Sequence, residues 1–220
     1  MITPMWQQHP EQFESHITVD CAADRLDRLA QWSADRGLEF LHIVLARGRM
    51  TSQPMVTLTG TGTLAEHRAA VAAAAEALRA DGFRPVRVKV EAAPWASGVP
   101  GSDAEAAALP ADTYFEHHVK VRLRPGQSRD RLAERVRGHG AHVSWNARRA
   151  DGPDGEQRFV TQRCHGVGLA TAGERLAALL GALADGFDVR SVEREFVLHD
   201  SNTSVDDGWL DVQPELEGAR

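Results

Sequence analysis

The chain has 220 residues, of which 31 are acidic and 25 are lysine or arginine, so its formal net charge at pH 7 is −6. This length suits one large domain or two small ones of about 100–110 residues each. The acidic balance leaves no basic excess that could follow the phosphates of duplex nucleic acid, so we expect no partner of that kind. Hydrophobic residues at 42% and charged residues at 25% are typical of a folded globular protein.

The sequence predicts a cytoplasmic protein. No apolar run approaches the roughly 18–20 residues that span a bilayer, and the N-terminal residues lack the basic start and apolar core of a signal peptide. The two cysteines, Cys21 and Cys164, are too few for a disulfide scaffold, so both thiols are expected to be reduced. The sequence does not indicate an oligomeric state, and we expect the partner to be a small-molecule substrate, an anionic one.

The two halves of the sequence share a pattern. The segment at 13–19 (FESHITV) reappears at 115–121 (FEHHVKV), an offset of 102 residues. An Ala-Asp-Gly-Phe segment at 80–83 reappears at 184–187, an offset of 104 residues. A near-constant offset over this length predicts an internal duplication.

In chain order, each half is predicted to contain a strand, a helix, two strands, a helix and a final strand. Strands with alternating polarity and helices with apolar residues three and four positions apart carry this prediction. The strands of the first half are expected at 13–19, 38–47, 53–60 and 86–92, with helices near 22–36 and 64–80. Those of the second half are expected at 115–121, 141–149, 156–164 and 191–198, with helices near 127–138 and 170–184.

The order βαββαβ is that of a ferredoxin-like module. We therefore predict an α+β fold with two such modules in tandem, related by a pseudo-twofold axis, with a polar cleft between the two sheets. The first module is expected at 1–95, an Ala-, Pro-, Gly- and Ser-rich linker at 96–113, the second module at 114–200 and an acidic C-terminal tail at 201–220. Two residues of the tail, Trp209 and Leu210, are candidate anchors.

Strand parity predicts which polar residues share a face. Successive strand residues point to opposite faces of a sheet, and apolar residues such as Phe13 and Ile17 occupy the helix-covered face. The polar residues between them are expected on the open face, toward the cleft. These are Glu14, His16, Thr18, Arg87, Lys89 and Glu91 in the first half, and Glu116, His118, Lys120, Glu193 and Glu195 in the second. Arg47 and Arg148, at matching ends of the second strands, are expected near the same cleft.

The segment His16-Ile17-Thr18-Val19 resembles the His-x-Thr/Ser-x motif of the two-histidine phosphoesterase superfamily, whose bilobed members carry one motif in each lobe. The resemblance implies a metal-independent phosphodiesterase-type hydrolase that acts on a nucleotide or another small phosphorylated ligand. His16 and His118 would be its acid–base pair, since imidazoles titrate near neutral pH. Thr18 and Lys120 would hold the phosphate, with lysine standing where the second motif has a hydroxyl. The other expected substrate-binding residues are Glu14, Glu116, Lys89, Arg47 and Arg148.

A divalent metal ion is the alternative cofactor. The order His16, Glu91, His118, Glu195 is similar to the ligand order of vicinal-oxygen-chelate enzymes, which hold one ion between paired modules. Imidazoles and carboxylates suit a first-row divalent metal with open positions for substrate. This resemblance implies a lyase, isomerase or dioxygenase, although the modules of those enzymes are βαβββ and lack a counterpart of the helix at 64–80.

A third interpretation is a protein without catalytic activity. An antiparallel sheet with one solvated face shows the same alternation of polar and apolar residues, and tandem ferredoxin-like modules also serve as ligand-binding or protein-binding modules. Outside the cleft, His67 is expected on the exposed face of its helix.

Overall fold

The computed structural model describes residues 11–149 and 155–209. The strands of the first half are β1 (Glu11–Asp20), β2 (Glu39–Leu45), β3 (Ser52–Gly62) and β4 (Arg84–Ala92), and its helices are α1 (Leu26–Ala34) and α2 (Leu64–Ala80). The strands of the second half are β5 (Tyr114–Leu123), β6 (Ala141–Asn146), β7 (Glu156–His165) and β8 (Asp188–Asp200), and its helices are α4 (Arg129–Arg137) and α5 (Leu169–Ala184). The short helices are η2 (Ala23–Arg25), α3 (Asp103–Ala106) and η3 (Thr203–Asp206).

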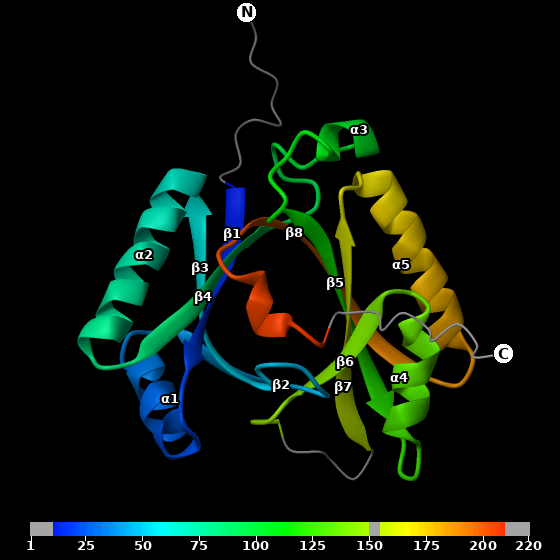
Figure 1. The fold of residues 1–220 in the computed structure, drawn as a ribbon, viewed down its shortest axis with the longest axis horizontal. Coiled ribbons are helices and arrows are strands. Elements are labelled where there is room, and N and C mark those ends of the chain that lie inside the picture. The colour runs from blue at the N-terminus through cyan, green and yellow to red at the C-terminus, as the bar shows by residue number, and fades with distance from the viewer. Residues whose placement is uncertain (1–10, 150–154, 210–220) are drawn as a thin grey trace, which may run out of the picture.

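The eight strands form one closed antiparallel barrel in the order β1-β3-β2-β6-β7-β5-β8-β4. Pairing of β4 with β1 completes the ring. Helices α1 and α2 lie outside the barrel on one side, and α4 and α5 lie outside it on the other (Figure 1). The predicted α+β class is therefore confirmed, and the order of helices and strands within each half is the predicted one.

The structure differs from the prediction of two separate sheets that face each other across a cleft. Strand β2 pairs with β6, where Val44 lies opposite Trp145, and β4 pairs with β8, where Lys89 lies opposite Asp200. The edge strands of the two halves thus satisfy each other's backbone hydrogen bonds, which leaves no exposed edge among these strands. The two expected open faces are joined as the interior of one barrel.

Apolar side chains pack between the outside of the barrel and the helices. In the first half, Ile17 and Val19 of β1 are fully buried in a cluster with residues of α1 and α2. In the second half, Val119 and Val121 of β5 belong to the equivalent cluster beneath α4 and α5. Because neighbouring strand residues alternate, this packing directs the intervening polar residues of β1 and β5 into the barrel.

His67 is buried, against the expectation that it would lie on the exposed face of α2. Its Nε2 is 2.8 Å from the hydroxyl of Ser15, and its ring stacks on Phe13 with ring centroids 5.4 Å apart. The imidazole fits because Gly60 has no side chain, since a Cβ there would lie 2.6 Å from His67 Nδ1. The absence of a side chain at Gly60 of β3 therefore leaves the space in which the His67 ring is buried.

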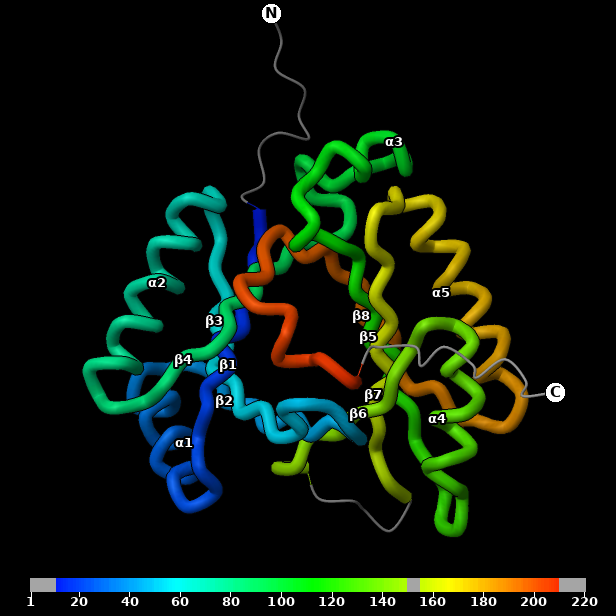
Figure 2. Tube along the Cα trace, in the orientation of Figure 1, coloured from blue at the N-terminus to red at the C-terminus, as the bar shows by residue number. Residues whose placement is uncertain are grey.

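The segment after β8 lies across the opening of the ring of strands (Figure 2). It carries η3, whose Asp206 points into the barrel interior. The expected anchor Trp209 is buried and donates a hydrogen bond from Nε1 to the carbonyl of Val143 at 3.2 Å. The other expected anchor, Leu210, lies outside the described residues. Within residues 11–149 and 155–209, no helix has both the length and the apolar character needed to cross a membrane.

Candidate functional site

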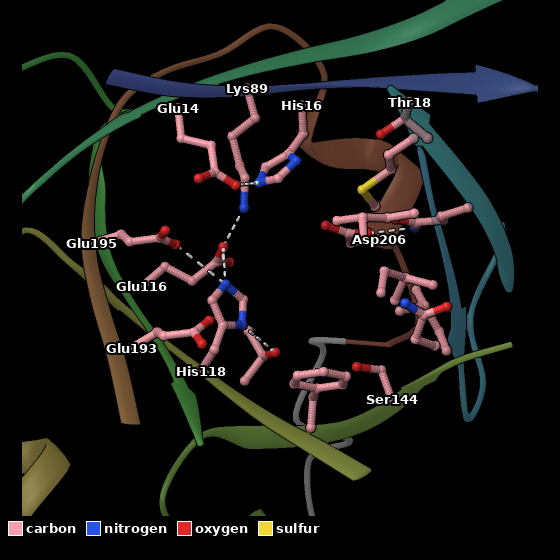
Figure 3. Close-up of a pocket in the computed structure, with 18 of the residues that line it drawn as sticks. Glu14, His16, Thr18, Lys89, Glu116, His118, Ser144, Glu193, Glu195 and Asp206 are labelled. Carbon is pink, nitrogen blue, oxygen red and sulfur yellow. Dashed lines mark hydrogen bonds and ion pairs between the residues drawn. The ribbon is translucent and has the colours of Figure 1, made fainter. Parts of the chain in front are cut away.

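A cavity of about 460 Å³ lies inside the barrel and is lined by residues from both halves of the chain (Figure 3). Ten of the eleven residues expected on the open faces line it: Glu14, His16, Thr18, Arg87, Lys89, Glu116, His118, Lys120, Glu193 and Glu195. The eleventh, Glu91, is buried beside the cavity against His16. Strand parity therefore brings the predicted polar residues of both halves together in one interior.

The first imidazole is held from both sides by neighbouring strands. His16 on β1 lies opposite Thr57 of β3, and its Nδ1 is hydrogen-bonded to the Thr57 hydroxyl at 2.8 Å. Its Nε2 lies 3.2 Å from Oε2 of Glu91 and 3.3 Å from Oε1 of Glu14. One ring nitrogen is thus oriented by a hydroxyl, and the other is directed at two carboxylates.

The second imidazole repeats this arrangement. His118 Nδ1 is 3.0 Å from the hydroxyl of Thr161, and its Nε2 lies 3.1 Å from Oε2 of Glu116 and 3.5 Å from Oε2 of Glu195. The three partners of His118 occupy positions in the second half of the sequence that match those of the three partners of His16 in the first half. The barrel therefore contains two half-sites of the same composition, each with one imidazole, two carboxylates and one hydroxyl.

Lys89 joins the two half-sites and breaks their symmetry, because the matching position in the second half is Glu193. The Lys89 ammonium group lies 2.7 Å from Oε1 of Glu91 and forms an ion pair with Oε2 of Glu116. Burial alone would raise the pKa of Glu91, but Lys89 and His16 lower it to about 2. Arg163 and Lys89 likewise hold the pKa of Glu116 well below its ordinary value despite burial. Both buried carboxylates are therefore ionised at neutral pH.

The charges around His118 stabilise its protonated form. Burial opposes protonation, but Glu116 and Glu195 outweigh it and raise the pKa of His118 to about 10. Glu14 differs from the buried carboxylates, because burial, together with the nearby charges of Glu195 and Glu91, raises its pKa. The cluster thus combines ionised carboxylates, an imidazolium and a carboxyl group that takes up a proton more readily than usual.

A second layer of ion pairs supports the cluster from the side of η3. Arg87 donates from Nε to Oδ1 of Asp200 at 2.9 Å and from Nη1 to Oδ2 of Asp206 at 2.8 Å. Arg163 contacts the same Oδ2 of Asp206 at 2.9 Å and also pairs with Oε1 of Glu116 at 2.5 Å. Asp200 at the end of β8 and Asp206 of η3 are therefore connected through arginines to the histidine cluster.

Sequence reasoning missed several members of this layer. Arg163 lies two residues from Thr161 on β7 and Tyr114 two residues from Glu116 on β5, so strand parity could have placed both inside. Tyr114 donates its hydroxyl to Oδ2 of Asp200 at 2.7 Å. No pattern could have placed Asp206, because it lies in an irregular segment whose path depends on the closed barrel.

Arg47 and Arg148 are not at the site, which corrects their expected placement. Both are exposed and neither lines the cavity. The guanidinium of Arg148 donates to Oδ1 of Asp27 at 2.8 Å and lies over the ring of Phe40. Strands β2 and β6 end before these arginines, so strand parity no longer governs where their side chains point.

Thr18 and Lys120 do line the cavity. The hydroxyls bonded to the imidazoles, however, come from Thr57 and Thr161 on the neighbouring β3 and β7 rather than from Thr18. The contacts of the imidazoles are therefore made across strands, which a motif confined to one strand does not reveal.

Four side chains of the cluster bring possible metal ligands close together. One ligand atom each from Glu91, Glu116, His118 and Glu195 lies within 4.8 Å of the others. The ligand set expected from sequence had His16 in place of Glu116, and His16 instead lies at the edge of this group through its contact with Glu91.

The connected ion-pair network carries an excess of negative charge. It contains six carboxylates and three permanent cations: Glu14, Glu91, Glu116, Glu195, Asp200 and Asp206 with Arg87, Lys89 and Arg163. With neutral imidazoles the formal charge is therefore about three units negative. One divalent cation would offset two of these charges.

Comparison with known proteins identifies no family. No family model matches the chain, and no curated protein matches it. The small subunit of acetolactate synthase from Thermotoga maritima aligns with 86% of this chain and 94% of its own, at 10% identity and a TM-score of 0.32. Chlorite dismutase from Candidatus Nitrospira defluvii aligns with 91% of this chain and 94% of its own, at 9% identity and a TM-score of 0.28. Likeness at this level gives no information on the chemistry of the site.

Proposed function

We propose that the protein is a metal-dependent enzyme that holds one first-row divalent cation inside the barrel and acts on a small molecule there. The observation that carries the proposal is the convergence of ligand atoms from Glu91, Glu116, His118 and Glu195 within 4.8 Å. Imidazole together with carboxylate is a donor set that suits manganese, iron or zinc.

The direction of the imidazoles supports this assignment. Nε2 of His118 faces Oε2 of Glu116 at 3.1 Å and Oε2 of Glu195 at 3.5 Å, so a neutral imidazole would aim its lone pair between two carboxylates. Its other nitrogen is hydrogen-bonded to Thr161, which orients the ring. Such a contact behind a ligating imidazole is typical of protein metal sites.

The charge of the network supports it as well. A divalent cation bound in place of the His118 proton makes the formal charge of the network one unit less negative. Lys89 helps to keep Glu91 and Glu116 ionised, which is the form that binds a metal. A cation held there would polarise a substrate oxygen or acidify a bound water. Glu14, whose pKa is raised, would accept or donate the proton.

We also propose that the two halves are duplicated ferredoxin-like modules. The support is the identical order of elements in each half and the matching half-sites around His16 and His118. A duplication would explain why each half supplies one imidazole with a threonine hydroxyl on Nδ1. The different residues at the matching positions 89 and 193, Lys89 and Glu193, would then have made the two half-sites unequal in charge.

The metal-independent phosphoesterase is the second candidate. It is favoured by one observation, that both imidazoles line a single cavity with Thr18 and Lys120. The carboxylates within 3.3 Å of His16 Nε2 and 3.5 Å of His118 Nε2 weigh against it, because they repel a phosphate. Hydrolysis of 2′,3′-cyclic nucleotides that persists in excess chelator would favour this candidate over the metal-dependent one.

Manganese binding tests the metal site. We expect metal-depleted protein to bind about one Mn²⁺ per chain, and Glu195→Gln to weaken binding by about 100-fold or more, since even groups behind the ligands typically contribute 10–100-fold. Free Mn²⁺ is measured by electron paramagnetic resonance during the titration.

The matched control for this titration is His199→Asn. His199 pairs with Asp112 at 2.7 Å and does not line the barrel cavity, so its replacement should leave Mn²⁺ binding unchanged. Absence of stoichiometric Mn²⁺ binding by the unaltered protein, or equal binding by Glu195→Gln, would contradict the proposal.

A further inference from the structure

The cavity has an apolar wall opposite the charged cluster. The cluster is built on β1, β4, β5 and β8, and in the barrel order β2 and β6 lie across the ring from β8 and β4. Leu41, Ile43 and Leu45 are alternate residues of β2, and all three line the cavity, with Glu39 at the start of the same strand. Met55 of the neighbouring β3 adds to this apolar surface, and Phe159 of β7 lies beyond β6, whose Ser144 and Asn146 also line the cavity. Figure 3 shows the charged residues Glu14, Lys89, Glu116, Glu193 and Glu195 gathered at one side of the cavity.

Lys120 lies where the two walls meet. It is two residues beyond His118 on β5 and pairs in register with Phe159, and its ammonium group lies 5.7 Å from the centre of that ring. Three other cations that line the cavity, Lys89, Arg87 and Arg163, are neutralised by carboxylates. A fourth, Arg149, is exposed just beyond the end of β6 and donates to Oε1 of Gln157 at 3.4 Å. Among the residues that the structure describes, no carboxylate forms an ion pair with Lys120. This ammonium group is therefore available to an anion that enters the cavity.

We propose that the site binds a small amphiphilic anion, with its apolar body against the β2 side of the barrel and its anionic group paired with Lys120. This inference names the substrate class for the proposed metal-dependent function and rests on it for the chemistry at the charged wall. The volume of about 460 Å³ suits a small molecule, and the segment that carries η3 lies across one opening of the barrel. A polymer or a fully hydrophilic ligand would leave the apolar wall without a partner.

Isothermal titration calorimetry with three probes tests the proposal on the full-length protein. The probes are 3-phenylpropanoate, its neutral isostere 3-phenylpropan-1-ol, and acetate, which has the anionic group without the apolar body. We expect 3-phenylpropanoate to bind at least about tenfold more tightly than either of the others, because a charge-assisted contact and the apolar burial both contribute. In Lys120→Met, which keeps the aliphatic stem, this preference for the acid over the alcohol should be lost.

The same samples are titrated with Mn²⁺, so failure of this inference is distinguishable from failure of the metal site. Stoichiometric Mn²⁺ binding without a preference for 3-phenylpropanoate would overturn the substrate class alone. A preference for 3-phenylpropanoate that depends on Lys120, without Mn²⁺ binding, would overturn the metal site and support the ligand class. An alcohol that binds as tightly as the acid, or no binding of any probe, would overturn the inference. The comparison of probes on the unaltered protein holds even if Lys120→Met does not fold.

Discussion

Replacement of Arg87 by leucine is expected to lower the free energy of unfolding by about 3–5 kcal/mol, the usual effect of removing one partner from a buried ion pair. The Arg87 side chain is 4% exposed, and those of its partners Asp200 and Asp206 are 0% and 1% exposed. Leucine would leave Asp200 buried without its arginine partner. Asp206 would keep its pair with Arg163 but lose one of the contacts that fix η3 inside the barrel. Urea denaturation monitored by circular dichroism measures the change.

Arg84→Leu is the matched control on the same strand. Arg84 pairs with Asp20 at 3.0 Å, which is close to the distances in the Arg87 pairs, but its side chain is 77% exposed. Solvent-exposed ion pairs contribute about 0–1 kcal/mol, so this variant should unfold nearly as the unaltered protein does. Equal stability losses for the two variants would show that the Arg87 network does not hold the barrel and the η3 segment together.

The metal-free protein is expected to lose about 3 kcal/mol of stability as the pH rises from about 6.5 to about 10. His118 has a pKa near 10 in the folded state, against about 6.5 when unfolded. Between these values the folded chain holds a proton that the unfolded chain has released, so the free energy of unfolding falls with rising pH. Each pKa unit corresponds to about 1.4 kcal/mol, and the total is reduced because a quarter of the side chain is exposed.

Urea denaturation in excess chelator at pH 6, 8 and 9.5 measures this dependence. In His118→Asn the part of the slope that belongs to His118 should disappear. In His199→Asn it should persist, because His199 pairs with Asp112 and does not line the cavity. A flat profile for the unaltered protein between pH 6.5 and pH 10 would contradict the assigned ionisation of the cluster.

The interior of the barrel was predictable to the extent that it follows from strand parity. Residues such as His16 and Lys120 alternate with apolar neighbours that pack under the helices, and the side chain period of a strand is two. The same rule, together with the three- and four-residue spacing of apolar residues in helices, predicted the order of strands and helices within each half. It could not show that the two halves close into one ring, because pairing of β2 with β6 and of β4 with β8 depends on long-range backbone contacts.

Several placements that sequence reasoning missed depend on more than the periodicity of a strand or helix. Arg47 and Arg148 follow the last residues of β2 and β6 and point outward, whereas Asp206 lies in an irregular segment and points inward. His67 is buried because Gly60, on another strand, leaves room for its ring. The placements of Arg148, Asp206 and His67 each include a contact with a residue distant in the sequence, which local pattern does not encode.

The central claim is that a divalent cation binds between the two half-sites, and anomalous diffraction from crystals grown with Mn²⁺ tests it most directly. We predict one strong anomalous peak inside the barrel, in direct contact with side chains of the proposed ligand set: Glu91, Glu116, His118 and Glu195. In Glu195→Gln crystals treated in the same way the peak should weaken or vanish. A barrel interior without an anomalous peak, with Lys89 and both imidazoles still paired to the carboxylates, would contradict the claim.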